Sequence, residues 1–205
     1  MRRARPDGFL ELVHRLDKET SGLLLVAKTR PALVKLQNDL RSRAPGRAIG
    51  KTYAALVAGE WPEALKVIDV ALRKDLAADG SRHVRVVDAD DARARRSISL
   101  VRVARRFGDF SLVEVALKTG RTHQIRVHLA DAGHAIVGDP KYGDFALNHA
   151  LARGALVAPL RFERMFLHAA RLRFVHPTIG TPLELAAPLP PACTALLDAL
   201  AARVP

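Results

Sequence analysis

Short runs of apolar residues, rich in Leu and Val and divided by polar turns, follow one another along most of the chain. Runs of this length and composition are typical of β-strands. The clearest pair is a hairpin, because Gly108-Asp109 forms a two-residue turn that matches the twist of paired strands. Residues 73–96 are polar and weakly patterned, and we expect a strand and loop excursion there. The predicted strands cover residues 12–17, 23–29, 52–58, 66–72, 97–107, 110–117, 135–137, 166–175 and 183–186.

Apolar residues recur at helical spacing in the remaining segments. One helix is expected after Pro31 and should end at Pro45-Gly46. A second is expected to begin with Thr122 as its N-cap and to end at Gly133. A short helix within 143–164 and a last helix opened by Pro190-Pro191 complete the set. Many strands, mostly antiparallel, with a few helices predict an α+β fold with a mixed, mainly antiparallel β-sheet core and flanking helices.

Composition excludes several classes of protein. With 49% hydrophobic residues in 205, the chain can form a sizeable core, which excludes a disordered protein. Cys193 is the only cysteine, so a disulfide-stapled domain is excluded and a reducing compartment is favoured. There is no run of about 18 uncharged apolar residues, and no apolar stretch follows the basic N-terminus. We therefore expect a cytoplasmic protein with no membrane partner.

The charge of the chain is strongly positive. Lys and Arg number 33 against 21 Asp and Glu, a net charge of +12, and 25 of the 33 cations are Arg. Arg suits phosphate because its planar fork makes two hydrogen bonds. The basic residues are spread along the whole chain, as in a folded domain with a broad basic face that binds nucleic acid. A solvated surface without a partner stays open as the plainer interpretation.

Three familiar site patterns do not fit the sequence. Residues 46–52 have three residues between their glycines, whereas a phosphate-binding P-loop has four, and the order of helix and strand is reversed. His123 and His128 are five residues apart and do not share a helix face as zinc ligands would, so no metal is expected. Ser21 does not lie in the nucleophile elbow of a hydrolase.

Three other segments gather polar side chains. HRLDKETSG at 14–22 places Asp17 between two cations at a turn, where a turn-capping Asp is the alternative. KTYAALV at 51–57 places Tyr53 in an apolar strand, where core packing is the alternative. GRTHQIRVH at 120–128 gathers two Arg and two His around a helix start, and a helix tip that only binds phosphate is the alternative.

Together these segments resemble the motifs of the RluA-type family of RNA pseudouridine synthases. HRLDKETSG is similar to the family's catalytic Asp motif, KTYAALVAGE to its Tyr strand, and LKTGRTHQIRVHLADAGHAIVGDPKYGD to its third motif. The stretches FLELVHRLD and RMFLHAARLRFVHP are most similar to the RluC branch, which modifies large-subunit (23S) ribosomal RNA. The resemblance runs from Phe9 to Pro190 and implies the pseudouridine synthase catalytic fold.

One feature departs from the family pattern. Members usually carry a Lys-Pro-x-Gly segment in an opening strand, often after a small S4-like RNA-binding domain. Sixteen residues precede Asp17, and no Lys-Pro occurs in them. We therefore expect a single catalytic domain over 1–205 that lacks this opening strand and any N-terminal S4-like domain.

The resemblance implies that the chain isomerises specific uridines of RNA to pseudouridine. The bond from C1′ to N1 is broken, and the flipped-out base is turned and rejoined through C5, which requires no cofactor and no metal. Asp17 is then the nucleophile, at C1′ or at C6 of the base. Arg121 would hold Asp17 in its charged form, and Tyr53 would stack on the uracil and assist removal of the C5 proton.

The resemblance also implies roles in substrate binding. Arg15 would fill the place that the flipped base leaves, and Ile125 would close the apolar floor of the pocket. Contacts to phosphate or ribose are expected from four further side chains: Lys118, His123, Gln124 and Arg126.

A non-catalytic RNA-binding protein with the same basic face is the rival hypothesis. Asp17 with Tyr53 and Arg121 argues against it, since a carboxylate facing phosphates would repel them. The basic composition, with no evident apolar patch in the sequence, favours a monomer.

Overall fold

The computed structural model of the chain describes residues 8–42, 44, 48–76 and 82–203. Its helices are α1 (Arg30–Arg41), α2 (Gln124–Asp131), α3 (Phe145–Ala152) and α4 (Pro191–Ala201). Its strands are β1 (Glu11–Leu12), β2 (Ser21–Gly22), β3 (Val26–Ala27), β4 (Gly50–Ala58), β5 (Val67–Leu76), β6 (Arg82–Val87), β7 (Arg95–Arg106), β8 (Phe110–Leu117), β9 (Leu167–Val175) and β10 (Pro182–Ala186).

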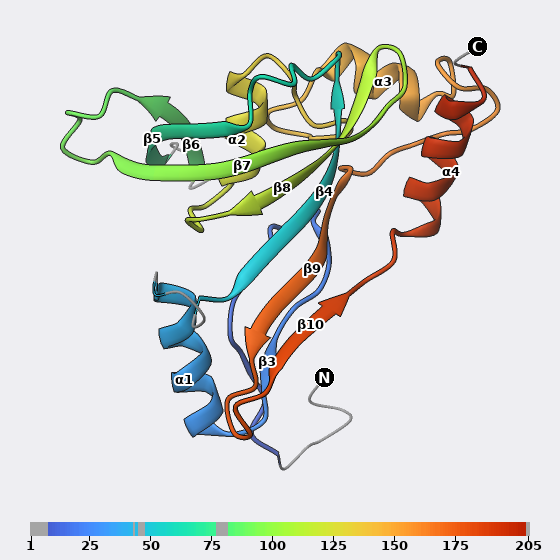
Figure 1. Cartoon of the computed structure of the whole chain (residues 1–205). Coiled ribbons are helices and arrows are strands. Elements are labelled where there is room, and N and C mark those ends of the chain that lie inside the picture. Colours follow the sequence, from blue (N-terminus) through green and yellow to red (C-terminus); the bar gives the residue numbers. More distant parts are fainter. Residues whose placement is uncertain (1–7, 43, 45–47, 77–81, 204–205) are drawn as a thin grey trace.

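One eight-stranded sheet organises the molecule (Figure 1). Its strands follow the order β10-β9-β4-β8-β7-β5-β6, and all of these neighbours are antiparallel. The short β2 pairs parallel with β9, which makes the sheet mixed. β1 and β3 form a separate antiparallel pair. The expected α+β fold with a mixed, mainly antiparallel sheet is confirmed.

Strand β4 lies inside the sheet and separates two cores, because successive side chains of a strand point to opposite faces. Tyr53 and Val57 pack on one face with Ile125 of α2. Leu56 packs on the opposite face with Leu196 of α4. β4 therefore holds Tyr53 on the face that α2 covers.

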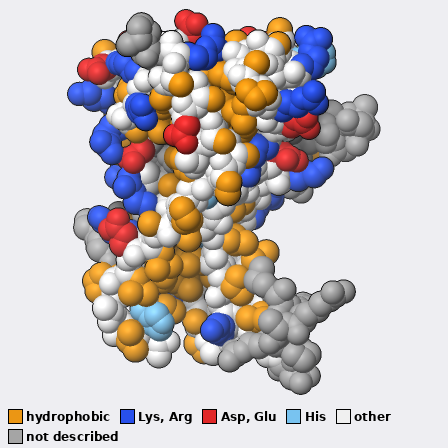
Figure 2. Space-filling view, turned by 90° about the vertical axis from the view of Figure 1, so that its right-hand side faces the viewer, with side chains coloured by type: hydrophobic (Ala, Val, Ile, Leu, Met, Phe, Trp, Pro, Cys, Tyr) orange, Lys and Arg blue, Asp and Glu red, His pale blue; other side chains and the backbone are white. Residues whose placement is uncertain are grey.

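A third core joins α1 to the part of β9 farthest from α2 (Figure 1). Leu36 of α1 packs there with Leu172 and Phe174 of β9. Figure 2 shows charged side chains over the upper half of one face of the molecule and apolar side chains gathered over the lower half. Exposed apolar side chains are thus gathered on one part of this face, whereas the sequence showed no evident apolar patch.

Most of the predicted elements are confirmed, including the Gly108-Asp109 hairpin and α1. The strand predicted at 12–17 is wrong beyond Leu12, because the amide of Thr20 donates to the carbonyl of Asp17 and closes a turn. The one predicted at 23–29 is reduced to β3.

The remaining differences lie at element ends. Thr122 is not the cap of α2, because His123 takes that position, and 135–137 forms only a bridge between Ile136 and Val57. Gly133 follows the end of α2 with a positive φ, as expected. Pro45-Gly46, the predicted end of α1, lies outside the described residues.

Helix α2 buries a histidine against the sheet. His128 is 1% exposed, and neither of its ring nitrogens has a hydrogen-bond partner within the described residues. Burial lowers the pKa of His128 to about 4, although the charge of Asp69 on β5 acts in the opposite direction. The folded state therefore holds this ring neutral, whereas the unfolded chain protonates it at its ordinary pKa near 6.5.

We predict that His128 makes the fold acid-sensitive. A group whose pKa is lowered on folding contributes stability above its unfolded pKa and loses it as pH falls toward its folded pKa. Between pH 7 and pH 5 the loss from His128 should be about 2 kcal/mol of unfolding free energy. Urea unfolding at both pH values should show a smaller loss for His128→Leu. His149→Gln, a change at an exposed residue of α3, should keep the wild-type loss. Equal losses in all three proteins would contradict the assignment.

Candidate active site

The turn that carries Asp17 is fixed against strand β9. Gly22 pairs with Ala169, and a Cβ on Gly22 would lie 2.3 Å from the Ala169 carbonyl oxygen. Gly22 also has a φ of +108°, which favours glycine. Beside it the Ser21 hydroxyl lies 2.9 Å from Nδ1 of His168. The Ser-Gly pair that ends HRLDKETSG therefore docks the Asp17 turn onto the sheet.

Tyr53 of β4 lies at the same cavity as Asp17. The pairing of β4 with β9 shifts register between Thr52 and Tyr53, an irregularity of the kind that re-aims side chains beside active sites. Burial, and then the negative charge of Asp17, raise the pKa of Tyr53 to about 12. The phenol is therefore protonated at neutral pH and presents an uncharged ring.

The loop before α2 is held by the side chain of Gln124, which is 2% exposed. Its Oε1 accepts hydrogen bonds from the Thr119 hydroxyl and from the amide of Arg121. Its Nε2 donates to the carbonyl of Ile98 and the hydroxyl of Ser99. All four hydrogen-bonding positions of the Gln124 amide are occupied inside the protein, so this side chain shapes the loop. Its expected contact with phosphate or ribose stays a prediction.

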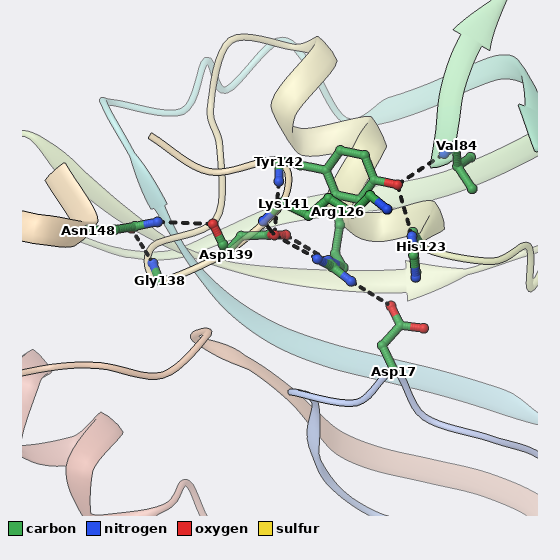
Figure 3. Close-up of polar contacts among 9 residues, drawn as sticks. All are labelled: Asp17, Val84, His123, Arg126, Gly138, Asp139, Lys141, Tyr142 and Asn148. Atoms are coloured by element: carbon green, nitrogen blue, oxygen red, sulfur yellow. Dashed lines mark hydrogen bonds and ion pairs between the residues drawn. The ribbon is translucent and has the colours of Figure 1, made fainter. Parts of the chain in front are cut away.

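The guanidinium beside Asp17 belongs to Arg126, the third residue of α2 (Figure 3). Its Nη1 lies 3.7 Å from Oδ2 of Asp17. Its Nε and Nη2 each donate a 2.7 Å hydrogen bond to Asp139. The sequence interpretation gave this pairing to Arg121, which is exposed and forms no ion pair with Asp17 in the described part of the chain. Arg126 is 6% exposed, and its expected contact with phosphate or ribose stays a prediction.

Asp139 is 0% exposed and anchors this arrangement. Besides Arg126, the amides of Lys141 and Tyr142 donate to its Oδ1 at 2.8 and 3.0 Å. Burial acts to raise the pKa of Asp139, but these hydrogen bonds outweigh it and the pKa is lowered. Burial likewise opposes the positive charge of Arg126, yet its bonds to Asp139 and the charge of Asp17 raise its pKa. Both partners therefore stay charged.

These side chains surround a cavity of about 110 Å³, lined by polar and apolar groups in similar measure. Of the residues named from the sequence, Arg15, Asp17, Tyr53, Arg121, His123, Gln124, Ile125 and Arg126 line it. Lys118 is exposed and is not part of the lining, and its expected contact with phosphate or ribose stays a prediction. Ile125 is buried at the cavity wall, in keeping with an apolar floor.

The sequence interpretation missed several residues of this site. Thr20 and Lys51 line the cavity, and burial lowers the pKa of Lys51. Asp139 and Tyr142 lie in the DPKYGD end of the third motif, which was quoted without a role for either residue. The sequence feature that could have pointed to them is an acidic and an aromatic side chain in a short polar loop. Their partners, Arg126 for Asp139 and His123 for Tyr142, become clear only in the folded structure.

Two absences hold for the described residues alone. They contain no group of three or more His, Cys, Asp or Glu side chains that could hold a metal ion. No described helix is both long and apolar enough to cross a membrane.

The sequence of the chain is similar to that of known proteins. Residues 3–131 match the family described as RNA pseudouridylate synthase. "Ribosomal large subunit pseudouridine synthase C" of Pasteurella multocida (strain Pm70) is 42% identical over 98% of this chain and 57% of that protein. The protein of the same name from Escherichia coli (strain K12) is 42% identical over 92% of this chain and 56% of its own length. The chain thus spans little more than half the length of these relatives.

Solved structures agree with the sequence comparison. "Human RNA Pseudouridylate Synthase Domain Containing 4" superposes with a TM-score of 0.72 at 26% identity, covering 93% of this chain and 76% of that one. "Human RNA Pseudouridylate Synthase Domain Containing 1" gives 0.71 at 27% identity, over 97% and 82%. The family match covers more than half of the chain and includes the turn of Asp17, the strand of Tyr53 and helix α2. The chain therefore belongs to the RNA pseudouridylate synthase family.

Proposed function

We propose that the chain converts uridine in RNA to pseudouridine, with Asp17 as the nucleophile. The observation that carries the proposal is the ion pair of Asp17 with the buried guanidinium of Arg126 at the wall of the cavity. The guanidinium holds the carboxylate in place at the cavity wall, and a carboxylate can serve as a nucleophile toward carbon. Family membership supplies the reaction class, in which the base leaves C1′ through N1 and returns through C5.

Tyr53 and Arg126 act on Asp17 and the base in different ways. The neutral ring of Tyr53 offers a stacking surface for a flipped uracil, which is worth about 1–3 kcal/mol per base. Arg126 is held by Asp139 and so presents Nη1 to Asp17 from a fixed direction. In this proposal Arg126 takes the role that the sequence interpretation gave to Arg121.

The cations at the cavity suit an RNA strand. Arg15 and Arg121 are exposed where they line it, and Lys51 lies beside them, half-buried. These three are placed to meet phosphates next to the target nucleotide, with Arg15 available for the space that the base leaves. The net charge of +12 adds long-range attraction to the same partner.

Large-subunit ribosomal RNA is the substrate we propose, because the curated relatives at about 42% identity are named for that substrate. A cytoplasmic location follows from this substrate and from a single cysteine that is buried. A monomer is likewise our proposal, and sedimentation of the chain without RNA tests it.

The rival is a protein that binds RNA without modifying it. A pure binder gains nothing from a carboxylate among its phosphate contacts, and a buried Arg–Asp pair behind that carboxylate adds no contact with RNA. The arrangement is explained by chemistry at the carboxylate.

We predict that Asp17→Asn removes turnover and leaves RNA binding intact. The amide keeps the shape of the side chain but is no nucleophile, so pseudouridine formation should fall at least about 1,000-fold. Tritium release from large-subunit ribosomal RNA transcribed with C5-labelled uridine measures it. Glu19→Gln removes an exposed carboxylate of the same turn and should keep wild-type turnover. Turnover that survives in Asp17→Asn would exclude Asp17 as the nucleophile.

A matched pair of variants separates the two arginines. Arg126→Lys keeps the charge but loses the bidentate hydrogen bonds to Asp139, so kcat should fall roughly 100-fold. Arg121→Lys should keep kcat and weaken RNA binding only slightly, because a phosphate contact survives the exchange. Circular dichroism should confirm that both variants fold. A larger loss of kcat at Arg121 would return the pairing role to that residue.

A further inference from the structure

His123 has a strained backbone at the edge of the cavity. Its φ is 52° and its ψ 19°, and among the described residues it is the one non-glycine with positive φ. Non-glycine residues in the left-handed region are strained and persist where the surroundings fix them, often at functional sites. The conformation places the ring between Tyr142 and the side of the cavity where Asp17 lies (Figure 3).

The ring of His123 is oriented from behind by a short hydrogen-bond chain. The amide of Val84 on β6 donates to the phenol oxygen of Tyr142 at 3.1 Å. The same oxygen lies 2.9 Å from Nδ1 of His123. The phenol oxygen of Tyr142 already accepts a hydrogen bond from the Val84 amide, so the phenol O–H donates to Nδ1 of His123. If the ring donated instead, the phenol oxygen would accept twice and its proton would need a third partner.

This chain fixes the tautomer of His123. With Nδ1 accepting from Tyr142, the ring proton of the neutral form is on Nε2, which points toward Asp17 in Figure 3. The ring is neutral at pH 7, because burial lowers the pKa of His123 and the charges of Arg126 and Lys141 reinforce it, while Asp17 and Asp139 act in the opposite direction. His123 thus offers the cavity a neutral N–H donor.

We propose that Nε2–H of His123 donates a hydrogen bond to a carbonyl oxygen of the target uracil, and that Tyr142 is a positioning residue for this donor. The inference rests on the proposed function, since it needs uridine beside Asp17. When Asp17 attacks C1′, a bond forms between its carboxylate oxygen and C1′ as the C1′–N1 bond breaks. N1 keeps the electron pair, so the detached base is an anion whose charge spreads onto its two carbonyl oxygens. A fixed donor strengthens as that charge develops and gives up no proton.

A phosphate is a poorer partner for this nitrogen. A phosphate at His123 would lie near the carboxylate of Asp17, which repels it, and the guanidinium of Arg121 serves phosphate better. A neutral donor beside the nucleophile instead suits the base, which enters the site uncharged and becomes an anion only during the reaction. His123 therefore recognises the base rather than the backbone, which refines the earlier expectation of a phosphate or ribose contact.

His123→Asn is the variant that tests the donor. Asn tolerates the left-handed backbone, and its amide group occupies the place of Nδ1 beside Tyr142 but does not reach the place of Nε2. We expect kcat to fall roughly 100-fold with KM little changed. Tyr142→Phe should lower kcat in the same sense and by less. His149→Asn, at an exposed residue of α3, should leave both values as they are.

Sulfur substitution in the RNA distinguishes a donor from a structural role. Four short RNAs serve as substrates. One carries the uridine that the wild-type chain modifies, and the others carry 2-thiouridine, 4-thiouridine or 2′-deoxyuridine at that position. Sulfur accepts hydrogen bonds poorly, so wild-type kcat should fall about tenfold on one thio-RNA, and His123→Asn should show no such difference. The inference is wrong if wild type and His123→Asn show the same loss of kcat on the thio-RNAs. It is also wrong if the difference in kcat between the two proteins disappears only on the 2′-deoxyuridine RNA. Absence of pseudouridine from wild-type reactions would instead overturn the proposed function and the inference with it.

Discussion

The site depends on burying one guanidinium. Arg126 is nearly inaccessible, and a buried charge costs several kcal/mol unless a partner of opposite charge meets it with good geometry. Asp139 meets that requirement with two 2.7 Å hydrogen bonds. The pair ties the loop after β8 and α2 to the loop that precedes α3, and it leaves Nη1 of Arg126 for Asp17. Removing either partner would leave the other charge buried alone, so the two segments are coupled through this contact.

The sheet order explains how distant parts of the chain meet at that guanidinium. β9 comes late in the sequence, yet it lies next to β4 and receives the Asp17 turn at Gly22. β4 carries Tyr53 on the face that α2 covers, and α2 carries Arg126. Three segments separated by tens of residues therefore converge because one sheet places β9 and β4 side by side.

The sequence predicted what short-range patterns determine. Apolar runs located β4, β5, β7, β8 and β9, and Pro31 with the leucine spacing located α1. Choosing between Arg121 and Arg126 was beyond such patterns, because both belong to one motif and the choice depends on how the chain enters α2. His123 makes that entry in a left-handed conformation, which is uncommon for any residue other than glycine and which tertiary contacts impose. The partners of Arg126 and His123, Asp139 and Tyr142, are likewise set by folding rather than by spacing.

The division of Arg126 between two carboxylates has a chemical consequence. Asp139 takes the two short hydrogen bonds, and Asp17 receives the remaining nitrogen at 3.7 Å. In the proposed reaction Asp17 offers an oxygen lone pair to carbon, and a bidentate pair with Arg126 would occupy both of its oxygens. The looser contact of 3.7 Å still keeps the Asp17 carboxylate beside the guanidinium. Asp139 thus holds Arg126 beside Asp17 and prevents Arg126 from forming a tighter, bidentate pair with the Asp17 carboxylate.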